Sequence, residues 1–114
     1  MIRKIICIIV FGLLSRKEDN MVVGSMDFKN IPNEIGEIEI GYGIGKKYEH
    51  NGYMTEAVKT FCEWALTNKE IETVIAETEK EHAASQRVLE RCGFKKYKEE
   101  ETAWWKLNKN IYIT

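Results

Sequence analysis

Residues 37–57 read EIEIGYGIGKKYEHNGYMTEA and carry the most informative pattern of the 114-residue chain. Over residues 37–44, apolar side chains alternate strictly with Glu or Gly, which predicts a β-strand with two different faces. From Thr55 the apolar residues follow a helical period that continues to about Asn68, and Thr55 is positioned to cap the helix. The segment therefore predicts a strand, a polar loop ending in Gly52, and a helix.

The rest of the chain supplies strands on both sides of this unit and one more helix. Upstream, residues 5–14 and 21–28 predict an antiparallel pair of strands joined by a polar turn over residues 17–20. Downstream, the predicted elements are a strand over 73–77, a helix over 83–92 ended by Gly93, and strands over 94–98 and 102–107. The predicted order is β-β-β-α-β-α-β-β, an α+β fold with a mixed, mostly antiparallel sheet and two main helices. Residues 1–114 form one domain.

The composition excludes several classes of protein. A formal net charge of −1 provides no field that would gather nucleic acid or an anionic membrane. Cys7, Cys62 and Cys92 are odd in number and lack metal-ligand spacing, so we expect no disulfide framework and no metal site. These features favour a cytoplasmic protein whose helical cysteines are small buried side chains.

The N-terminus permits a second interpretation. Residues 1–14, MIRKIICIIVFGLL, resemble the basic and apolar parts of a signal peptide, which would make the protein secreted. The run is too short to span a bilayer, no small-residue cleavage site follows it, and its Ile and Val content suits a buried strand. The strand is the interpretation that we adopt.

The loop before the first helix has the features of an anion site. A helix N-terminus presents unpaired N–H groups and the positive end of the helix dipole, and Gly52 allows close approach to its backbone. Gly41 and Gly43 share one face of the preceding strand and leave a strip without side chains. A glycine turn before a helix is common, so the residues alone leave anion binding and an ordinary turn both open.

Two motifs together resemble those of the GNAT superfamily of N-acetyltransferases. Ile40-Gly41-Tyr42-Gly43-Ile44 followed by Asn51-Gly52-Tyr53-Met54-Thr55-Glu56-Ala57 is similar to its acetyl-CoA motif. The segment HAASQRVLERCGF, residues 82–94, is similar to its N-x-x-S-x-x-V-L-E-K-x-G-F helix. The resemblance covers essentially the whole chain and is nearest to the ribosomal-protein-alanine and spermidine acetyltransferase branch. It implies acetyl-CoA as co-substrate, without a metal, and an amine as acceptor.

The resemblance also implies where the cofactor binds. The strand that carries Tyr42 would splay from its parallel neighbour around Val74, pantetheine would enter the opening, and the loop amides would hold the pyrophosphate. The implied cofactor-binding residues are Tyr42, Gly43, Ile44, Glu49, His50, Asn51, Gly52, Tyr53, Met54, Thr55, His82 and Ser85.

Two residues are candidates for proton transfer during direct attack of the amine on the acetyl carbonyl. Glu39 could take a proton from the ammonium through water, and Ser85 could donate one to the departing thiolate. The structural alternatives are a solvated strand carboxylate for Glu39 and a helix-start residue for Ser85. Leu89 stands where many relatives have a tyrosine acid, so that route is closed.

Departures from the family pattern support a rival function. Glu49 replaces the usual Arg or Gln beside the pyrophosphate, His50 replaces a glycine, and His82 replaces an asparagine. Relatives also begin with a strand and two helices that wall the acceptor site, whereas this sequence begins at the hairpin. The rival is a non-catalytic CoA-binding or subunit-interaction module. The same departure, with the apolar run over residues 5–11, predicts a homodimer in which a second copy covers exposed surface.

Overall fold

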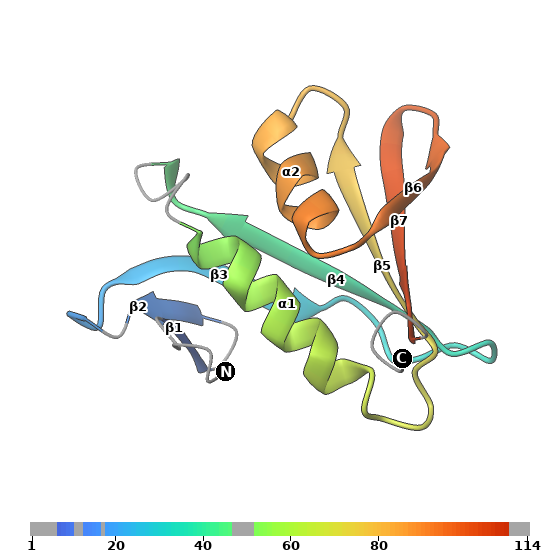
Figure 1. Cartoon of the computed structure of the whole chain (residues 1–114), viewed down its shortest axis with the longest axis horizontal. Coiled ribbons are helices and arrows are strands. Elements are labelled where there is room, and N and C mark those ends of the chain that lie inside the picture. Colours follow the sequence, from blue (N-terminus) through green and yellow to red (C-terminus); the bar gives the residue numbers. More distant parts are fainter. Residues whose placement is uncertain (1–6, 11–12, 17, 47–51, 110–114) are drawn as a thin grey trace.

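A seven-stranded sheet carries both helices in the computed structural model, which describes residues 7–10, 13–16, 18–46 and 52–109. The spatial strand order is β1-β2-β3-β4-β5-β7-β6 (Figure 1). All neighbouring strands are antiparallel except β4 and β5, which are parallel. The elements are β1 (Cys7–Val10), β2 (Leu13–Arg16), β3 (Val22–Phe28), β4 (Glu37–Ile44), α1 (Tyr53–Ala65), β5 (Thr73–Glu79), α2 (Ala83–Arg91), β6 (Lys95–Glu99) and β7 (Thr102–Asn108).

The predicted α+β class and the alternation of strands and helices are confirmed, with one difference near the N-terminus. The strand predicted over residues 5–14 is divided between β1 and β2, which pair antiparallel with each other, Val10 opposite Leu13. A continuous apolar run shows that a segment is buried, but it contains no polar turn to indicate where the chain reverses. The predicted turn is present downstream, where Asn20 adopts a left-handed conformation with φ 60°.

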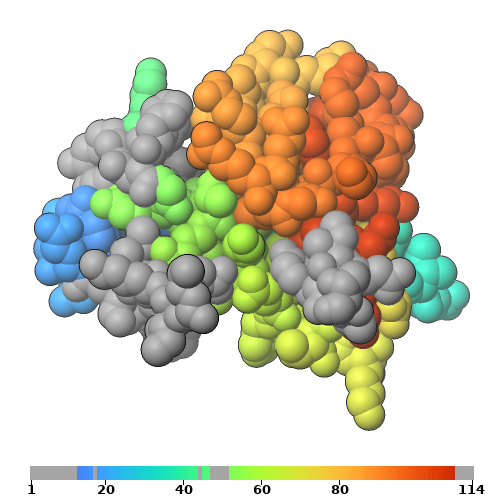
Figure 2. Space-filling model, viewed as in Figure 1, coloured from blue at the N-terminus to red at the C-terminus, as the bar shows by residue number. Residues whose placement is uncertain are grey.

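One face of the sheet forms the core together with the two helices. The inward residues of the central strands are fully or almost fully buried, as are the stripe residues of α1 and Leu89 of α2. In the space-filling view, the orange surface of α2 lies directly against the green surface of α1 (Figure 2). The buried residues at the middle of this core are Ile38, Ile40, Ala57, Val58, Cys62, Val74, Ala76 and Leu107.

The second helix ends where the sequence predicts. Gly93 has φ 93°, a left-handed conformation that favours glycine, and its N–H donates to the Glu90 carbonyl at 3.1 Å. The Phe94 N–H then bonds the Leu89 carbonyl at 3.0 Å, and Phe94 itself is buried. These bonds and the burial of Phe94 hold the C-terminal end of α2 against the sheet.

The central parallel pair comes apart halfway along its length. The register of β4 with β5 runs from Glu37 opposite Thr73 to Ile40 opposite Ala76 and stops there, although both strands continue. Beyond that point β4 is paired with β3, and β5 with β7. Figure 1 shows the two strands diverging toward their carboxyl ends, with α2 lying over the opening. The predicted splay is therefore present, and it begins at Gly41.

Candidate active site

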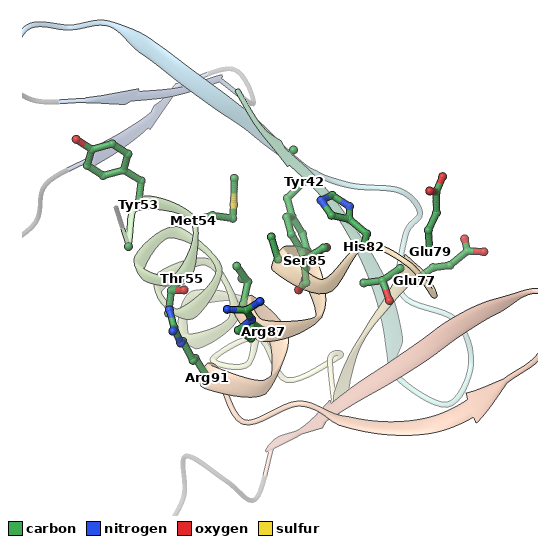
Figure 3. A pocket seen from close by; sticks show the side chains of 15 residues that line it. Tyr42, Tyr53, Met54, Thr55, Glu77, Glu79, His82, Ser85, Arg87 and Arg91 are labelled. Atoms are coloured by element: carbon green, nitrogen blue, oxygen red, sulfur yellow. Dashed lines mark hydrogen bonds between the residues drawn. The ribbon is translucent and has the colours of Figure 1, made fainter. Parts of the chain in front are cut away.

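A cavity of about 290 Å³ lies where β4 and β5 diverge (Figure 3). Four elements contribute to it: the end of β4, the start of α1, the end of β5, and one face of α2. Among the predicted cofactor-binding residues, those that line this cavity are Tyr42, Gly43, Gly52, Tyr53, Met54, Thr55, His82 and Ser85. The two sequence motifs, far apart along the chain, thus meet around one space.

The other four predicted cofactor-binding residues lie between Gly43 and Gly52. Glu49, His50 and Asn51 lie outside the described residues. The backbone of Ile44 forms the last position of β4, opposite Gly24 of β3. The cavity's boundary on the side of the β4–α1 connection is therefore defined by Gly52 and the first turn of α1.

Gly52 shapes the entrance to α1. It is the N-cap residue, with φ 77°, and no side chain caps the helix. A Cβ atom placed on Gly52 would meet no described heavy atom within 4 Å, so the space above the helix start is open. Because only glycine adopts this conformation without strain, the sequence keeps both a left-handed turn and open access to the first N–H groups.

Thr55 does not have the capping role predicted for it. The helix begins at Tyr53, which places Thr55 inside the first turn of α1. Its carbonyl oxygen accepts a bond from Cys92 Sγ at 3.4 Å, which links the start of α1 to the end of α2. The first helical bond runs from the Glu56 N–H to the Gly52 carbonyl. The N–H groups of the residues between them point out of the helix start, as an anion site requires.

Tyr42 and Ser85 connect the diverging end of β4 to α2. The Tyr42 hydroxyl donates to the Ser85 carbonyl oxygen at 3.1 Å and lies 3.0 Å from Ser85 Oγ. The prediction for Tyr42 concerned only its backbone, so this side-chain contact is new. It places two hydroxyl groups together on the wall of the cavity.

Burial changes the acidity of Tyr42. Desolvation raises the pKa of its phenol well above 10, and the bond to Ser85 offsets only part of that increase. The phenol is therefore protonated throughout the physiological range and acts as a hydrogen-bond donor.

His82 lies at the N-terminus of α2. Its carbonyl accepts the Gln86 N–H at 3.2 Å, its own N–H donates to the Glu79 carbonyl at 3.1 Å, and its side chain makes no capping bond. The ring is exposed and stands above Tyr42 and Ser85 in Figure 3. His82 thus borders the cavity on the side where β5 turns into α2.

Glu39 lies away from the cavity. It is in the paired part of β4, opposite Ile75, on the sheet face that the helices do not cover. Its carboxylate is 3.5 Å from Lys29 Nζ, and its backbone N–H donates to Asn30 at 2.7 Å. The Lys29 side chain crosses over Gly41, where a Cβ would come within 2.9 Å of it. The predicted glycine strip is consequently covered at Gly41 and open at Gly43.

The cavity also contains residues that the motif analysis did not single out. Arg87 and Arg91 contribute one wall from α2, and Glu77 and Glu79 contribute another from β5. A helical period counted from Ser85 places residues 88 and 91–92 near its face, so the spacing of the motif indicates Arg91 but not Arg87, which is two positions from Ser85. The carboxylates of β5 could not be found in this way, because their position depends on where the strands separate.

Cys62 and Cys92 are buried thiols, as the sequence predicts for the apolar faces of the two helices. Burial raises the pKa of the Cys62 thiol and raises that of Cys92 to about 11, so both remain protonated and unreactive at neutral pH. Among the described residues no cluster of His, Cys, Asp and Glu side chains could hold a metal ion. None of the helices in that part of the chain combines the length and apolarity of a membrane span.

Comparison with known proteins identifies relatives with the same architecture. The chain is 32% identical over 103 residues to an uncharacterised N-acetyltransferase of Bacillus subtilis, YjdG. The alignment covers 90% of this chain and 58% of that protein. The ribosomal-protein-S5-alanine acetyltransferase of Vibrio fischeri superposes with a TM-score of 0.78 at 19% identity, over 86% of this chain and 60% of that one. The spermidine N-acetyltransferase of Vibrio cholerae, in complex with CoA and spermine, gives 0.77 at 12% identity, over 90% and 66%.

These structural similarities establish the fold, and a family model establishes the relationship. The model of the acetyltransferase (GNAT) domain matches residues 3–95, which include both motifs and the diverging strands. The chain spans a little more than half of the B. subtilis relative, 58% of its length. On the match to the family model, the chain belongs to the GNAT acetyltransferase domain family.

Proposed function

We propose that the chain binds acetyl-CoA in the cavity between β4 and β5 and transfers the acetyl group to an amine. The observation that carries the proposal is the divergence of the parallel pair after Ile40 and Ala76, with residues of both motifs around the opening. Backbone groups at the diverging edge of β4 have no partner strand in β5, so they are available to the amides of pantetheine. The match to the GNAT domain model supports acetyl-CoA as the ligand.

The start of α1 is suited to the pyrophosphate. Gly52 leaves its approach open, and the N–H groups of Tyr53, Met54 and Thr55 belong to the first turn of the helix. Glu49, His50 and Asn51 precede this turn and complete the proposed phosphate segment. Tyr42, Gly43 and Ile44 complete the pantetheine segment on the other side, with His82 and Ser85 beside the thioester.

The proposed reaction is direct transfer. The amine nitrogen attacks the acetyl carbonyl, a C–N bond forms, the C–S bond breaks, and the nitrogen loses a proton while the thiolate gains one. Ser85 is the proposed donor near the sulfur, because its hydroxyl lines the cavity and is oriented by Tyr42. Glu39 is the proposed acceptor of the ammonium proton through water, from the uncovered face of the sheet.

The acceptor is an amine of one of three classes: a polyamine, another small-molecule amine, or a protein N-terminus. The solved structures with this fold include both a ribosomal-protein-alanine enzyme and a spermidine enzyme. Acetyl-CoA turnover against a panel of these amines, followed by release of free thiol, tests the proposal. Thiol release that depends on one amine class supports it, and acetyl-CoA binding without acetylation of any of them contradicts transferase activity.

The rival, a non-catalytic CoA-binding or subunit-interaction module, is supported by the position of Glu39. Its carboxylate pairs with Lys29 and does not border the cavity. The turnover assay separates the two functions, because the rival binds acetyl-CoA and releases no thiol.

We also propose that the protein is a homodimer. Leu13, Met21 and Val22 are about half exposed at the β2–β3 end of the sheet, at 48%, 46% and 48%. Burying such side chains contributes roughly 25 cal/mol per Å² before the costs of association. Light scattering coupled to size-exclusion chromatography is expected to give twice 13.3 kDa at micromolar concentration. A 13.3 kDa species that does not change with concentration contradicts the dimer.

A further inference from the structure

The wall of the cavity formed by α2 carries two arginines on one helical face. Arg87 and Arg91 are four residues apart, so they lie one above the other along the helix, and both line the cavity. Figure 3 shows their side chains extending from α2 toward the first turn of α1, beside Thr55. The Cys92 Sγ to Thr55 carbonyl bond of 3.4 Å holds this end of α2 against that turn.

Neither arginine has a carboxylate partner within the described part of the chain. Other cations there form ion pairs, such as Arg16 with Asp19 at 2.6 Å and Lys96 with Glu99 at 2.9 Å. Arg87 and Arg91 are exposed and form no salt bridge with a described residue. Two guanidinium groups thus line the cavity without an ion-pair partner among the described residues, and the Glu77 and Glu79 carboxylates line another wall of it.

The neighbouring helix adds to this positive field. The start of α1 contributes open N–H groups and the positive end of its dipole, and the guanidinium groups approach the same turn from α2. A guanidinium offers a planar fork of donors that matches the oxygens of a phosphate, often through two parallel bonds. The cavity therefore has an anion-binding end defined by side chains as well as by backbone.

We infer that Arg87 and Arg91 form a phosphate-binding pair that holds the charged end of CoA against the first turn of α1. This inference rests on the proposed function, because it takes the ligand to be CoA. It assigns phosphate recognition to α2 in addition to the β4–α1 connection, where Glu49 places a negative charge. CoA carries a pyrophosphate and a 3′-phosphate, and either group has the chemistry that this pair recognises.

Binding measurements with three ligands test the pair. Calorimetry on the full chain compares CoA, dephospho-CoA and pantetheine for the wild type, Arg87→Gln, Arg91→Gln and the double variant. Loss of charge-assisted bonds is expected to weaken CoA binding by the double variant on the order of tenfold to a hundredfold. Pantetheine, which lacks both phosphate groups, is expected to bind all forms equally. Lys69→Gln removes one charge outside the cavity and is expected to bind like the wild type.

Each outcome bears on the pair. A loss for CoA with dephospho-CoA unchanged supports recognition of the 3′-phosphate, and a loss for both with pantetheine unchanged supports the pyrophosphate. Wild-type CoA affinity in the double variant, or an equal loss for pantetheine, overturns the inference. Melting curves without ligand confirm that the variants are folded. A wild type that binds CoA but releases no thiol from acetyl-CoA contradicts the proposed function and leaves the pair intact, whereas a wild type that does not bind CoA contradicts both.

Discussion

The two ends of the β4–β5 pair show how one pair of strands builds both a core and a site. At the paired end, residues 37–40 and 73–76 are in register, and Ile38, Ile40, Val74 and Ala76 are buried. At the diverging end, residues 41–44 and 77–79 have no register with each other, and their inward side chains include polar groups. The paired end derives its stability from apolar burial, whereas the diverging end exchanges strand pairing for access to a ligand.

Two polar side chains at the diverging end, Thr78 and Tyr42, nevertheless have hydrogen-bond partners. Thr78 is 4% exposed, and its hydroxyl accepts the Trp105 indole N–H at 3.0 Å. Tyr42 bonds Ser85 across the opening. A buried polar group without a partner costs about 1–3 kcal/mol, so these bonds allow the strands to separate without destabilising the fold. Hydrogen bonds therefore hold side chains in place on both strands of the diverging end.

The largest contrast is expected from two left-handed glycines, one at each end. Gly52, beside the cavity, has open space above it, so Gly52→Val is expected to block the approach to α1 and abolish acetyl-CoA binding. In the wild type, ligand at ~100 times Kd raises the free energy of unfolding by about 2.7 kcal/mol, and the variant is expected to lose this increase. Thermal melting with and without acetyl-CoA measures it. Full ligand stabilisation in the variant contradicts the assigned site.

Gly36 provides the matched control at the paired end. It has φ 78°, and a Cβ there would approach Glu72 Cγ at 3.0 Å and the Glu70 carbonyl at 3.1 Å. Gly36→Ala is expected to lower the free energy of unfolding by ~1–3 kcal/mol while the folded protein still binds acetyl-CoA. Loss of binding equal to that of Gly52→Val would show that the two ends are not separable.

A smaller effect is expected from the two proposed proton-transfer residues. Ser85→Ala at the diverging end and Glu39→Gln at the paired end are each expected to reduce turnover on the order of tenfold to a thousandfold, with CoA affinity nearly unchanged. Comparing the turnover of the two variants shows whether a residue on the uncovered face of the sheet contributes to catalysis as much as one in the cavity. Initial rates and calorimetry measure the two quantities separately, and wild-type turnover in both variants would assign structural roles to both residues.

Lys29→Ala sharpens the interpretation of Glu39. The variant removes the ammonium that lies 3.5 Å from the Glu39 carboxylate and uncovers Gly41. If Glu39 acts through water, Glu39→Gln is expected to reduce turnover in the Lys29→Ala background by at least the factor seen in the wild type. Initial rates of the single variants and the double variant measure the two factors.

The sequence predicted the paired end better than the diverging end, for physical reasons. Residues 37–44 alternate and form β4 over the same range, because alternation is a local property. Capping was assigned to Thr55, since hydroxyl side chains commonly cap helices, but the chain uses Gly52 in a left-handed turn. The contact of Tyr42 with Ser85 spans 43 positions in the sequence and depends on where the strands separate. No local pattern contains that information.

The same limit applies to charges near the site. Lys29 directly follows β3 and Glu39 is on β4, and the residues between them do not indicate that Lys29 crosses Gly41. By contrast, the position of α2 was predictable from the motif and its terminal glycine, and with it the face that carries Ser85 and Val88. Local sequence patterns thus predict the helices and strands, whereas the tertiary structure determines which side chains line the cavity.

The smallest predicted effect concerns alkaline pH and acts at the diverging end. Desolvation raises the pKa of Cys92 from 9.0 to about 11, and burial also raises the pKa values of Cys62 and Tyr42. A group with a raised pKa in the folded state holds its proton more tightly there than in the unfolded state. Its contribution to stability is therefore complete below pH 9 and is lost as the pH rises toward 11. The inward residues of the paired end do not titrate, so alkali is expected to weaken only the other end.

Urea unfolding at neutral pH and at pH values above 9 measures this loss. Cys92→Ala is the matched variant: it removes the titrating thiol and is expected to show a smaller decrease in the free energy of unfolding between the two conditions than the wild type. Hydrogen exchange locates the effect, because alkali weakens α1 and α2 near Cys92 and Tyr42 before it weakens the register of residues 37–40 with 73–76. Equal weakening of both ends, or an undiminished pH dependence in Cys92→Ala, would mean that the buried Cys92 thiol does not set the alkaline limit of the fold.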